Sequence, residues 1–251
     1  MKSNNSIISY IIIIIIILIA LRLILSKEDV NLSNESKNSN YKYIKEKRVL
    51  SSINEVKYVA EEHIDELKKV YEKKKFSKKE KDFILGLIRV SLEEEYKFGI
   101  PANIKIAQSI VESGWGRDGI AKNYNNYYGI KHKSYYTKEE KPLVSKPVSL
   151  RTHEYTKEGK KYYIDDKFIS YESRWASIRH HSIFLKTQME ISSRKGYKNL
   201  NNIPTNDYRG WAHNLQKAGY ATSPHYATNL IKIIEYYGLE NINLSQKGIS
   251  S

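Results

Sequence analysis

One stretch of this 251-residue chain has the period of a β-strand, and helical patterns lie on both sides of it. Residues 148–155 have a period of two, in which Val148, Leu150, Thr152 and Glu154 alternate with Ser149, Arg151, His153 and Tyr155. Glu158-Gly159 signals a turn, and residues 160–165 have the pattern of a return strand. In the segments around them, apolar residues recur at steps of three and four, the spacing of one helix face. The sequence therefore predicts a mostly helical α+β fold with one small β-hairpin lobe.

The N-terminal segment has the composition of a membrane-spanning helix. Residues 7–25 are almost wholly apolar, and residues 11–17 are unbroken isoleucine. Nineteen residues at about 1.5 Å each come close to spanning a hydrocarbon core of about 30 Å. No small-x-small cleavage site follows, so we predict a retained transmembrane helix; a cleaved signal peptide is the alternative. Lys2 before the span favours residues 1–6 as a short cytoplasmic tail, with the bulk of the chain outside the membrane.

The rest of the chain divides by composition. Residues 26–50 are rich in Asn, Ser, Lys and Glu, which predicts a polar tether. Residues 51–80 are predicted to form a helical, basic stalk, and residues 68–81 hold eight Lys and two Glu. These lysines suit a solvated helix end and linker, or alternatively a patch that binds an anionic polymer or lipid headgroups. The compact domain is predicted over residues 81–243, followed by a tail over residues 244–251.

Composition also excludes several kinds of chemistry. The chain has no cysteine, so disulfides, thiolate metal sites and cysteine nucleophiles are excluded. The seven histidines show no metal-like spacing, and His180 and His181 would point about 100° apart on a helix. We therefore predict neither a metal nor a cofactor. The net charge of +14 favours polyanionic partners, but nucleic acid is not expected if the bulk of the chain lies outside the membrane.

A carboxylate at a helix end is the first candidate for chemistry. Residues 101–113 predict a helix, and within an arc of about 160° it gathers Ile104, Ile106, Ala107, Ile110 and Val111. Glu112 lies at the edge of this stripe, one turn after Gln108, and residues 114–116 (Gly-Trp-Gly) end the helix. Partial desolvation raises the pKa of a rigidly held carboxyl group, so the group keeps its proton near neutral pH, as general acid catalysis requires. The alternative is a surface glutamate before a glycine helix stop.

A second carboxylate lies on the predicted hairpin. Glu154 shares a strand face with Leu150 and Thr152. A helical body and a hairpin lobe with one carboxylate on each would form a cleft, which is the plan of a glycoside hydrolase.

Four segments then resemble the bacterial peptidoglycan endo-β-N-acetylglucosaminidases, glycoside hydrolase family 73. They are residues 98–131, which include Val-Glu-Ser-Gly-Trp-Gly and Asn-Asn-Tyr-Tyr-Gly-Ile-Lys, residues 152–159, residues 168–178, and residues 219–226 (Gly-Tyr-Ala-Thr-Ser-Pro-His-Tyr). The resemblance covers about residues 82–239 in consistent order, and the motifs are specific only jointly.

The resemblance implies a lysozyme-like fold that cleaves the β-1,4 bond after N-acetylglucosamine in peptidoglycan glycan strands. By position, it makes Glu112 the general acid, Glu154 the second carboxylate, and Tyr220 a tyrosine beside the scissile sugar. Ser223 stands where the family often has Asp, and both residues cap helices well. With the predicted anchor, it implies a single-pass protein of the bacterial cell membrane whose catalytic domain lies on the wall side. The anionic polymer that the lysines of residues 68–81 would bind is then a polymer of the cell wall.

Five residues around these positions are predicted to bind substrate: Trp115, Asn126, Tyr127, Tyr128 and Tyr226. For Trp115 and Tyr127 the alternative is packing beneath the helix end and the Asn-Tyr-Tyr-Gly turn. For Asn126 the alternative is that its side chain fixes the backbone of that turn.

The mechanism and the bond cleaved stay open. The acetamido oxygen of the substrate could act as the nucleophile, oriented by Tyr220, or a water activated by Glu154 could attack instead. A lytic transglycosylase or a muramidase could use the same fold, and a wall-binding tether without turnover is a further alternative.

Overall fold

The computed structural model describes residues 51–156, 160–191, 193 and 195–245, and the described residues from Glu55 onward form one compact unit. The predicted tail, anchor and tether over residues 1–50 lie outside the described residues, as does the tail from residue 246 onward. Within the described ranges, no helix has both the length and the apolar character needed to cross a membrane.

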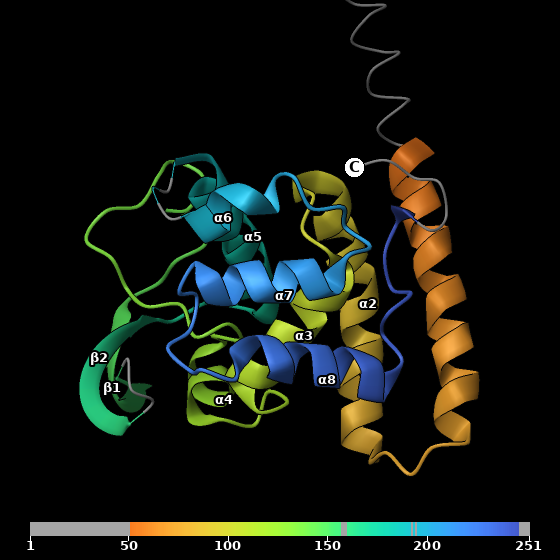
Figure 1. The fold of residues 1–251 in the computed structure, drawn as a ribbon, viewed down its shortest axis with the longest axis horizontal. Helices are drawn as coiled ribbons and strands as arrows, with labels where there is room; N and C mark the ends of the chain where they lie inside the picture. Colours follow the sequence, from red (N-terminus) through yellow and green to blue (C-terminus); the bar gives the residue numbers. More distant parts are fainter. Residues whose placement is uncertain (1–50, 157–159, 192, 194, 246–251) are drawn as a thin grey trace, which may run out of the picture. The chain divides into compact units, whose positions relative to one another are not determined.

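The described chain is a mostly helical α+β fold, and α3 is its central element. The elements in chain order are a helix over residues 51–72, α2 (Lys78–Phe98), α3 (Ala102–Ser113), α4 (Gly119–Tyr124), β1 (Pro147–Tyr155), β2 (Lys161–Ile169), α5 (Arg174–Ile191), α6 (Lys195–Leu200), α7 (Tyr208–Lys217) and α8 (Tyr226–Tyr237). Helices α2, α7 and α8 pack around α3, and the hairpin lies at the edge (Figure 1). The short helices α4 and α6 were not predicted, because six residues carry too little periodicity.

Capping residues set both limits of α2. The Ser77 hydroxyl accepts the N–H of Glu80 at 3.2 Å, and the Glu80 carboxylate accepts the N–H of Ser77 at 2.8 Å. These two reciprocal bonds form a capping box. The helix ends at Gly99, which has a φ of 66° and donates its N–H to the carbonyl of Glu95 at 2.8 Å.

The helix over residues 51–72 corrects the predicted stalk. Its buried side chains belong to the hydrophobic core of the compact unit: Val56, Val59, Ala60, Leu67 and Tyr71. The Tyr71 hydroxyl also donates to the carbonyl of Tyr237, at the end of α8, at 3.0 Å. An apolar stripe on one helix face requires a partner surface, and α8 and its neighbours supply it. The domain therefore includes the residues from about 55 onward, rather than beginning at residue 81.

The hairpin has the predicted position and a longer second strand. β1 and β2 are antiparallel, with Pro147 opposite Ile169 and Tyr155 opposite Lys161. The second strand runs on to Ile169 because its last two residues are buried. The N–H of Ile169 donates to the carbonyl of Ile130 at 3.1 Å, which attaches the base of the hairpin to the turn that follows α4.

Candidate functional site

Glu112 is the last residue but one of α3, and it is partly buried. Two polar residues on the same face of the helix precede it by four and seven positions, and both are fully buried: Gln108 and Lys105. A polar stripe therefore runs along α3 from the protein interior to Glu112.

The chain turns sharply after Glu112. Gly114, Trp115 and Gly116 have φ values of 51°, 64° and 70°, so three successive residues lie in the left-handed region. For Trp115, which has a Cβ, this conformation costs on the order of 1 kcal/mol. The Ser113 hydroxyl accepts the N–H of Gly116 at 2.8 Å and closes the turn. This turn holds the end of α3, and with it Glu112, in place.

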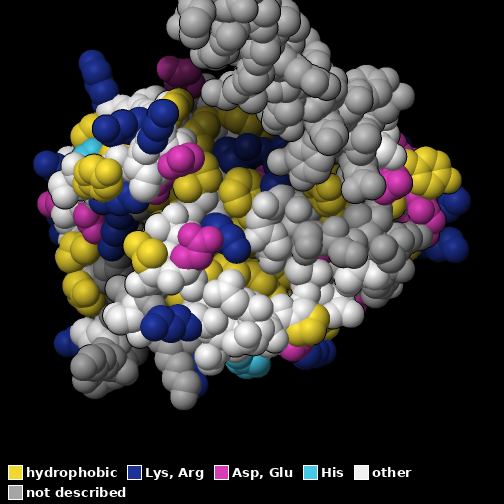
Figure 2. Space-filling view, turned by 90° about the horizontal axis from the view of Figure 1, so that it is seen from above, with side chains coloured by type: hydrophobic (Ala, Val, Ile, Leu, Met, Phe, Trp, Pro, Cys, Tyr) yellow, Lys and Arg dark blue, Asp and Glu magenta, His cyan; other side chains and the backbone are white. Residues whose placement is uncertain are grey.

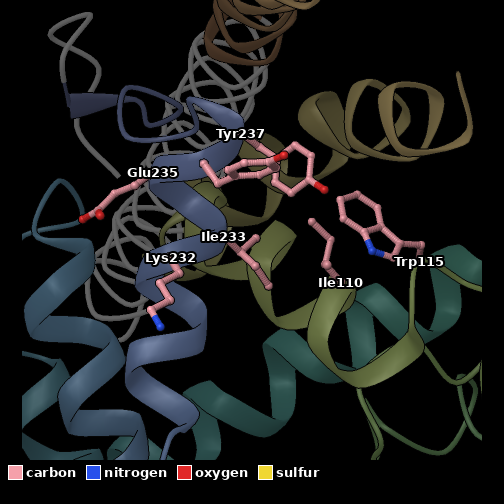
Figure 3. A pocket seen from close by; sticks show the side chains of 7 residues that line it. Ile110, Trp115, Lys232, Ile233, Glu235 and Tyr237 are labelled. Atoms are coloured by element: carbon pink, nitrogen blue, oxygen red, sulfur yellow. The ribbon is translucent and has the colours of Figure 1, made fainter. Parts of the chain in front are cut away.

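The side chain of Trp115 packs in an aromatic cluster. Its ring meets Phe83 and Tyr237 edge-on, with centroids 5.8 Å and 4.9 Å apart. Together with Ile110 and Ile233 it lines an open hollow of about 650 Å³ between α3 and α8 (Figure 3). Glu112 does not line this hollow. Two positions along α3 correspond to a rotation of about 200° around the helix axis, so Glu112 and Ile110 lie on nearly opposite sides of the helix. Packing thus accounts for Trp115, and its contact with a sugar stays a prediction.

Tyr226 lies beneath Glu112. It begins α8, its side chain is 1% exposed, and its hydroxyl accepts a hydrogen bond from Gln108 Nε2 at 2.9 Å. The same hydroxyl forms a side-chain hydrogen bond with Glu112. Burial and the neighbouring Glu112 charge raise the pKa of Tyr226 well above its ordinary value, so the hydroxyl keeps its proton. We therefore reassign Tyr226 from substrate binding to the support of Glu112.

Tyr220 lies in the same cluster, in the loop between α7 and α8. Its ring stacks on Tyr226 with centroids 5.6 Å apart and planes 20° apart. Its hydroxyl donates to the carbonyl of Tyr128 at 3.2 Å. Burial, followed by the charges of Tyr226 and Glu112, raises the pKa of Tyr220 well above its ordinary value. Glu112 and Tyr220, predicted from motifs more than a hundred residues apart, thus lie in one cluster.

The turn over residues 126–130 shapes another side of the site. Asn126 is fully buried; its amide donates to the carbonyls of Ile130 and Ile169, both at 2.9 Å, and its carbonyl accepts the N–H of Ile130 at 3.1 Å. Asn126 therefore fixes the turn and offers no surface to a substrate, which corrects its predicted role. Tyr127 is partly buried, and Arg174 lies over its ring at 5.1 Å, so its predicted role in binding stays open.

Tyr128 is also a buried support rather than a binding surface. Its side chain is 2% exposed and stacks on His181, with ring centroids 3.9 Å apart. The buried amine of Lys105 contacts the same histidine, at 3.0 Å from Nδ1, and donates to the Ser182 hydroxyl at 2.6 Å. Burial lowers the pKa of Lys105 to about 7. These residues form a buried layer under the turn that carries Tyr128.

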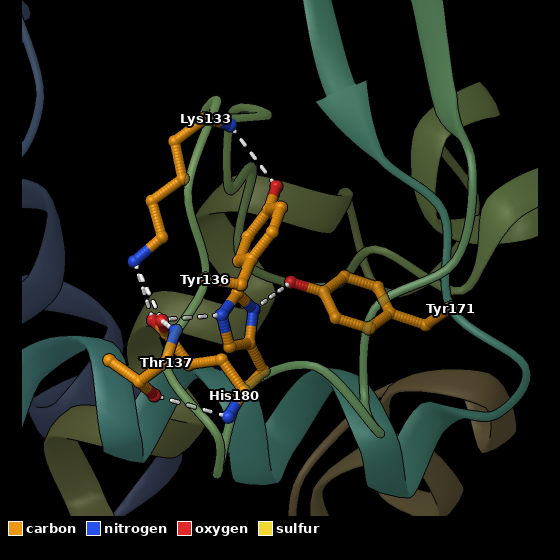
Figure 4. Close-up of polar contacts among 6 residues, drawn as sticks. Lys133, Tyr136, Thr137, Tyr171 and His180 are labelled. Carbon is orange, nitrogen blue, oxygen red and sulfur yellow. Dashed lines mark hydrogen bonds and ion pairs between the residues drawn. The ribbon is translucent and has the colours of Figure 1, made fainter.

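A second buried polar cluster anchors the loop that leads into β1 (Figure 4). The Glu140 carboxylate accepts hydrogen bonds from Lys133 Nζ at 2.7 and 2.9 Å and lies 3.3 Å from His180 Nε2 on α5. The Tyr171 hydroxyl lies 2.7 Å from the other ring nitrogen of His180. Burial lowers the pKa of His180 to about 4. The cluster fixes the start of β1 relative to α5.

The second carboxylate is placed only through its backbone. Glu154 lies in β1, opposite Tyr162 in the register, and its side chain is outside the described part of the structure. Residues of the same parity, Leu150 and Thr152, are partly buried, whereas Ser149 and Arg151 are exposed. The role of Glu154 as the second carboxylate stays a prediction. Across the described ranges, no three His, Asp or Glu side chains are arranged to hold a metal ion.

Two contributors to the site were not predicted as site residues. A Cβ at Gly129 would lie 3.1 Å from Glu112 Oε2, so a glycine leaves the space that the carboxylate occupies. Gln108 holds the hydroxyl of Tyr226. The helical pattern places Gln108 beside Glu112, but nothing in the sequence indicates which tyrosine it binds.

Comparison with known proteins identifies related chains. The family model described as mannosyl-glycoprotein endo-beta-N-acetylglucosaminidase, the Glucosaminidase family, matches residues 89–239. The exo-glucosaminidase LytG of Bacillus subtilis is 31% identical over 158 residues, which cover 61% of this chain and 51% of LytG. This chain thus spans about half the length of LytG, and smaller shares of the other curated relatives that it matches.

Solved structures share the fold. The catalytic domain of the autolysin Auto from Listeria monocytogenes is 26% identical with a TM-score of 0.52, over 67% of this chain and 90% of that one. An N-acetylmuramoyl-L-alanine amidase from Staphylococcus aureus is 27% identical with a TM-score of 0.55, over 66% of this chain and 44% of that one. These likenesses agree with the predicted lysozyme-like, mostly helical α+β fold.

Proposed function

Since the chain belongs to the glucosaminidase family, we propose that it is a glycoside hydrolase that cleaves the glycan strands of bacterial peptidoglycan, with Glu112 as its general acid. The observation that carries the proposal is the environment of Glu112. The carboxylate lies at the end of a buried helix, receives a hydrogen bond from buried Tyr226, and lies against the glycine backbone at Gly129.

This environment suits the first step of glycoside cleavage. The leaving oxygen of the glycosidic bond needs a proton, and a partly buried carboxyl group in a fixed orientation is able to deliver it. The oxocarbenium-like transition state then needs a nucleophile or a negative charge on the opposite face of the sugar. Either Glu154, acting through water, or the acetamido oxygen of the substrate, with Tyr220 nearby, would supply it.

Replacing the acid tests the proposal. Glu112→Gln keeps the size of the side chain but removes its proton, so the variant is expected to fold and to lose about 10²- to 10⁴-fold in cleavage of purified peptidoglycan. Release of soluble fragments from walls measures the rate, and circular dichroism checks the fold. Wild-type activity in the variant would remove Glu112 from the mechanism. A wild-type protein that sediments with walls and releases no sugar would instead be a non-catalytic tether.

Product analysis distinguishes the bonds that could be cut. We propose internal cleavage after N-acetylglucosamine, and mass spectrometry should then find fragments of several disaccharides that end in reducing N-acetylglucosamine. LytG carries the name of an exo-enzyme, so release of single units from the strand ends is the second candidate. Anhydro-muramyl ends would indicate a lytic transglycosylase, and reducing muramic acid a muramidase.

The apolar run over residues 7–25 supports a membrane anchor, with the catalytic domain on the wall side. The full-length protein should then fractionate with membranes and resist extraction by salt or alkali. Sequencing of the N-terminus of the protein from cells checks the alternative. A new N-terminus beyond residue 25 would mean a cleaved signal peptide.

The lysine-rich turn supports a second contact with the wall. Lys73, Lys74 and Lys75 are exposed between the helix over residues 51–72 and α2. Figure 2 shows further Lys and Arg side chains around the rim of another face. Because the proposed substrate is the wall, we favour anionic wall polymers over lipid headgroups as the partner of these lysines.

Exchange of these three lysines for serine tests that contact. The variant should bind walls more weakly at low salt, while binding to walls stripped of their anionic polymers stays unchanged. Weaker binding to anionic vesicles, with wall binding unaffected, would favour the lipid surface instead.

A further inference from the structure

The two faces of the hairpin differ in exposure. In the antiparallel register, the even-numbered residues of β1 and β2 share one face, the even face, and the odd-numbered residues share the other. On the even face, burial falls along β2 from its attached base toward its tip: Phe168 is 6% exposed, Asp166 and Ile164 are partly buried, and Tyr162 is 43% exposed. On the odd face, the β2 side chains over residues 161–167 are all exposed. The even face is therefore covered at its base and open at its tip.

The base of the even face lies against the turn that reaches Glu112. Asp166 pairs with Lys131, whose Nζ lies 2.8 Å from Asp166 Oδ2. Lys131 follows Gly129 by two positions, and Gly129 lies against the Glu112 carboxylate. Tyr162 lies four residues from Asp166 on the same face, about 13 Å along the strand at 3.3 Å per residue. The even face therefore extends from the turn beside Glu112 to the ring of Tyr162.

Tyr162 and its neighbour Tyr163 differ in what covers their rings. Tyr163 is on the odd face, where Lys161 Nζ and the guanidinium carbon of Arg151 lie 5.4 Å and 5.9 Å from its ring centroid. For Tyr162, the described part of the chain supplies no hydrogen bond, cation or second ring. Strand propensity favours tyrosine at both positions equally, so it does not explain the difference. The Tyr162 ring is thus an open apolar surface on the face that leads to Glu112.

We propose that Tyr162 contacts the substrate directly, and that its ring stacks on a sugar of the glycan strand that binds at Glu112. The inference rests on the proposed function, which makes that strand the substrate. A pyranose ring has a face of C–H groups and a rim of hydroxyl groups, and tyrosine has an apolar ring with a polar tip. Stacking of the two removes apolar surface from water and leaves the hydroxyl groups solvated. Tyr162 stands opposite Glu154 in the register, so the contact would also place a sugar beside the predicted second carboxylate.

Tyr162→Ala tests the contact, and Tyr163→Ala is its matched control, because the two tyrosines are adjacent, exposed and on opposite faces of one strand. Tyr162→Ala removes binding that is made equally in the ground state and in the transition state. KM for soluble glycan fragments should therefore rise about tenfold, while kcat stays within about twofold. Tyr163→Ala should change neither quantity. Tyr162→Phe keeps the ring, so its KM should stay within about threefold of the wild type. Circular dichroism checks that all three variants fold.

Binding is measured separately from cleavage in the Glu112→Gln background, in which the glycan is expected to stay intact. Isothermal titration calorimetry with peptide-free glycan strands should give a Kd about tenfold higher when Tyr162→Ala is added, and an unchanged Kd when Tyr163→Ala is added. The aromatic NMR signals of Tyr162, assigned by their loss in Tyr162→Phe, should shift on titration with the same strands. A role confined to the fold of the hairpin would leave these signals in place.

The outcomes separate the two proposals. If Tyr162→Ala keeps the wild-type KM and Kd, or if Tyr163→Ala raises them as much, Tyr162 does not contact the substrate and the proposed function is unaffected. A fall in kcat without a rise in KM would also overturn the contact, because the ring would then act only through its neighbours. If the folded wild-type protein neither binds nor cleaves the glycan, the proposed function fails, and the contact fails with it.

Discussion

Gly129 lies directly against Glu112: a Cβ at residue 129 would come within 3.1 Å of the Glu112 Oε2. Its φ of 62° is also in the left-handed region, which glycine adopts at least cost. The turn that ends at Ile130 thus approaches the carboxylate through a bare backbone. A side chain at this point would displace the carboxylate or the turn.

Gly129→Ala is therefore expected to impair activity more than stability. The left-handed backbone should cost about 1 kcal/mol of unfolding free energy, and displacement of Glu112 should lower kcat by about tenfold or more. Gly99→Ala is the matched control: its φ is 66°, and a Cβ there meets nothing within 4 Å. Thermal unfolding and wall digestion should show similar losses of stability in both variants and a loss of activity only in Gly129→Ala. Equal activity in both would contradict this contact.

Lys105 should make stability depend on pH. Burial lowers its pKa to about 7, against about 10.5 in the unfolded chain. Between these values the unfolded chain binds a proton that the folded chain does not, so this group makes stability rise with pH from 7 to 10. Lys105→Met removes the effect. The unfolding free energy of Lys105→Met minus that of the wild type should therefore be highest at pH 7 and below. Above pH 7 this difference should fall by up to about 1.4 kcal/mol per pH unit.

Thermal or urea unfolding of both proteins between pH 6 and pH 10 measures this difference. Lys97→Met, an exposed lysine on α2, is the control and should give a difference that does not vary with pH. A constant difference for Lys105→Met as well would mean that the buried amine has an ordinary pKa.

Trp115 should matter for folding rather than for binding. Its ring packs against Phe83 and Tyr237 and lines a hollow that Glu112 does not line. Trp115→Ala is expected to lower the unfolding free energy by about 2–4 kcal/mol, while KM for glycan fragments stays within about twofold. Trp175, which is 50% exposed, offers the comparison, and Trp175→Ala should cost much less. A stable Trp115→Ala protein with a strongly raised KM would restore the predicted sugar contact.

Glu140 should stabilise the fold at neutral pH and lose this effect in acid. Burial by itself would raise the pKa of Glu140, but hydrogen bonds from Lys133 and from the N–H of Thr137 outweigh it and lower the pKa. A lowered folded-state pKa means that the contribution is present above the unfolded value and disappears as the pH falls through the folded value. Glu140→Gln should therefore cost about 1–3 kcal/mol at pH 7 and less at low pH.

The adjacent, exposed Glu139 provides the control, because Glu139→Gln should change stability by less than about 0.5 kcal/mol at either pH. Equilibrium unfolding at pH 7 and at pH 4 checks both variants. A loss that is the same at both values would mean that packing, not charge, explains the contribution of Glu140.

Local signals specify the ends of several helices and the period of the strand. The Ser77–Glu80 capping box, the Gly99 and Gly238 helix ends and the period-two strand depend on neighbours within a few positions, so they are legible in sequence. The same holds for Glu112, whose place at the edge of an apolar helix face follows from the helical repeat alone.

The sequence by itself determined the order of the longer helices and the hairpin, and it indicated Glu112 as the candidate acid. Only the tertiary structure decided which side chains surround that residue. Gln108 meets Tyr226 across 118 positions, and Glu140 meets His180 across 40. It also decided that the helix over residues 51–72 joins the core and that Asn126 and Tyr128 are buried supports. The physical reason is that burial and hydrogen bonding depend on which surfaces meet after the helices pack, whereas helical and strand periods depend on neighbouring residues alone.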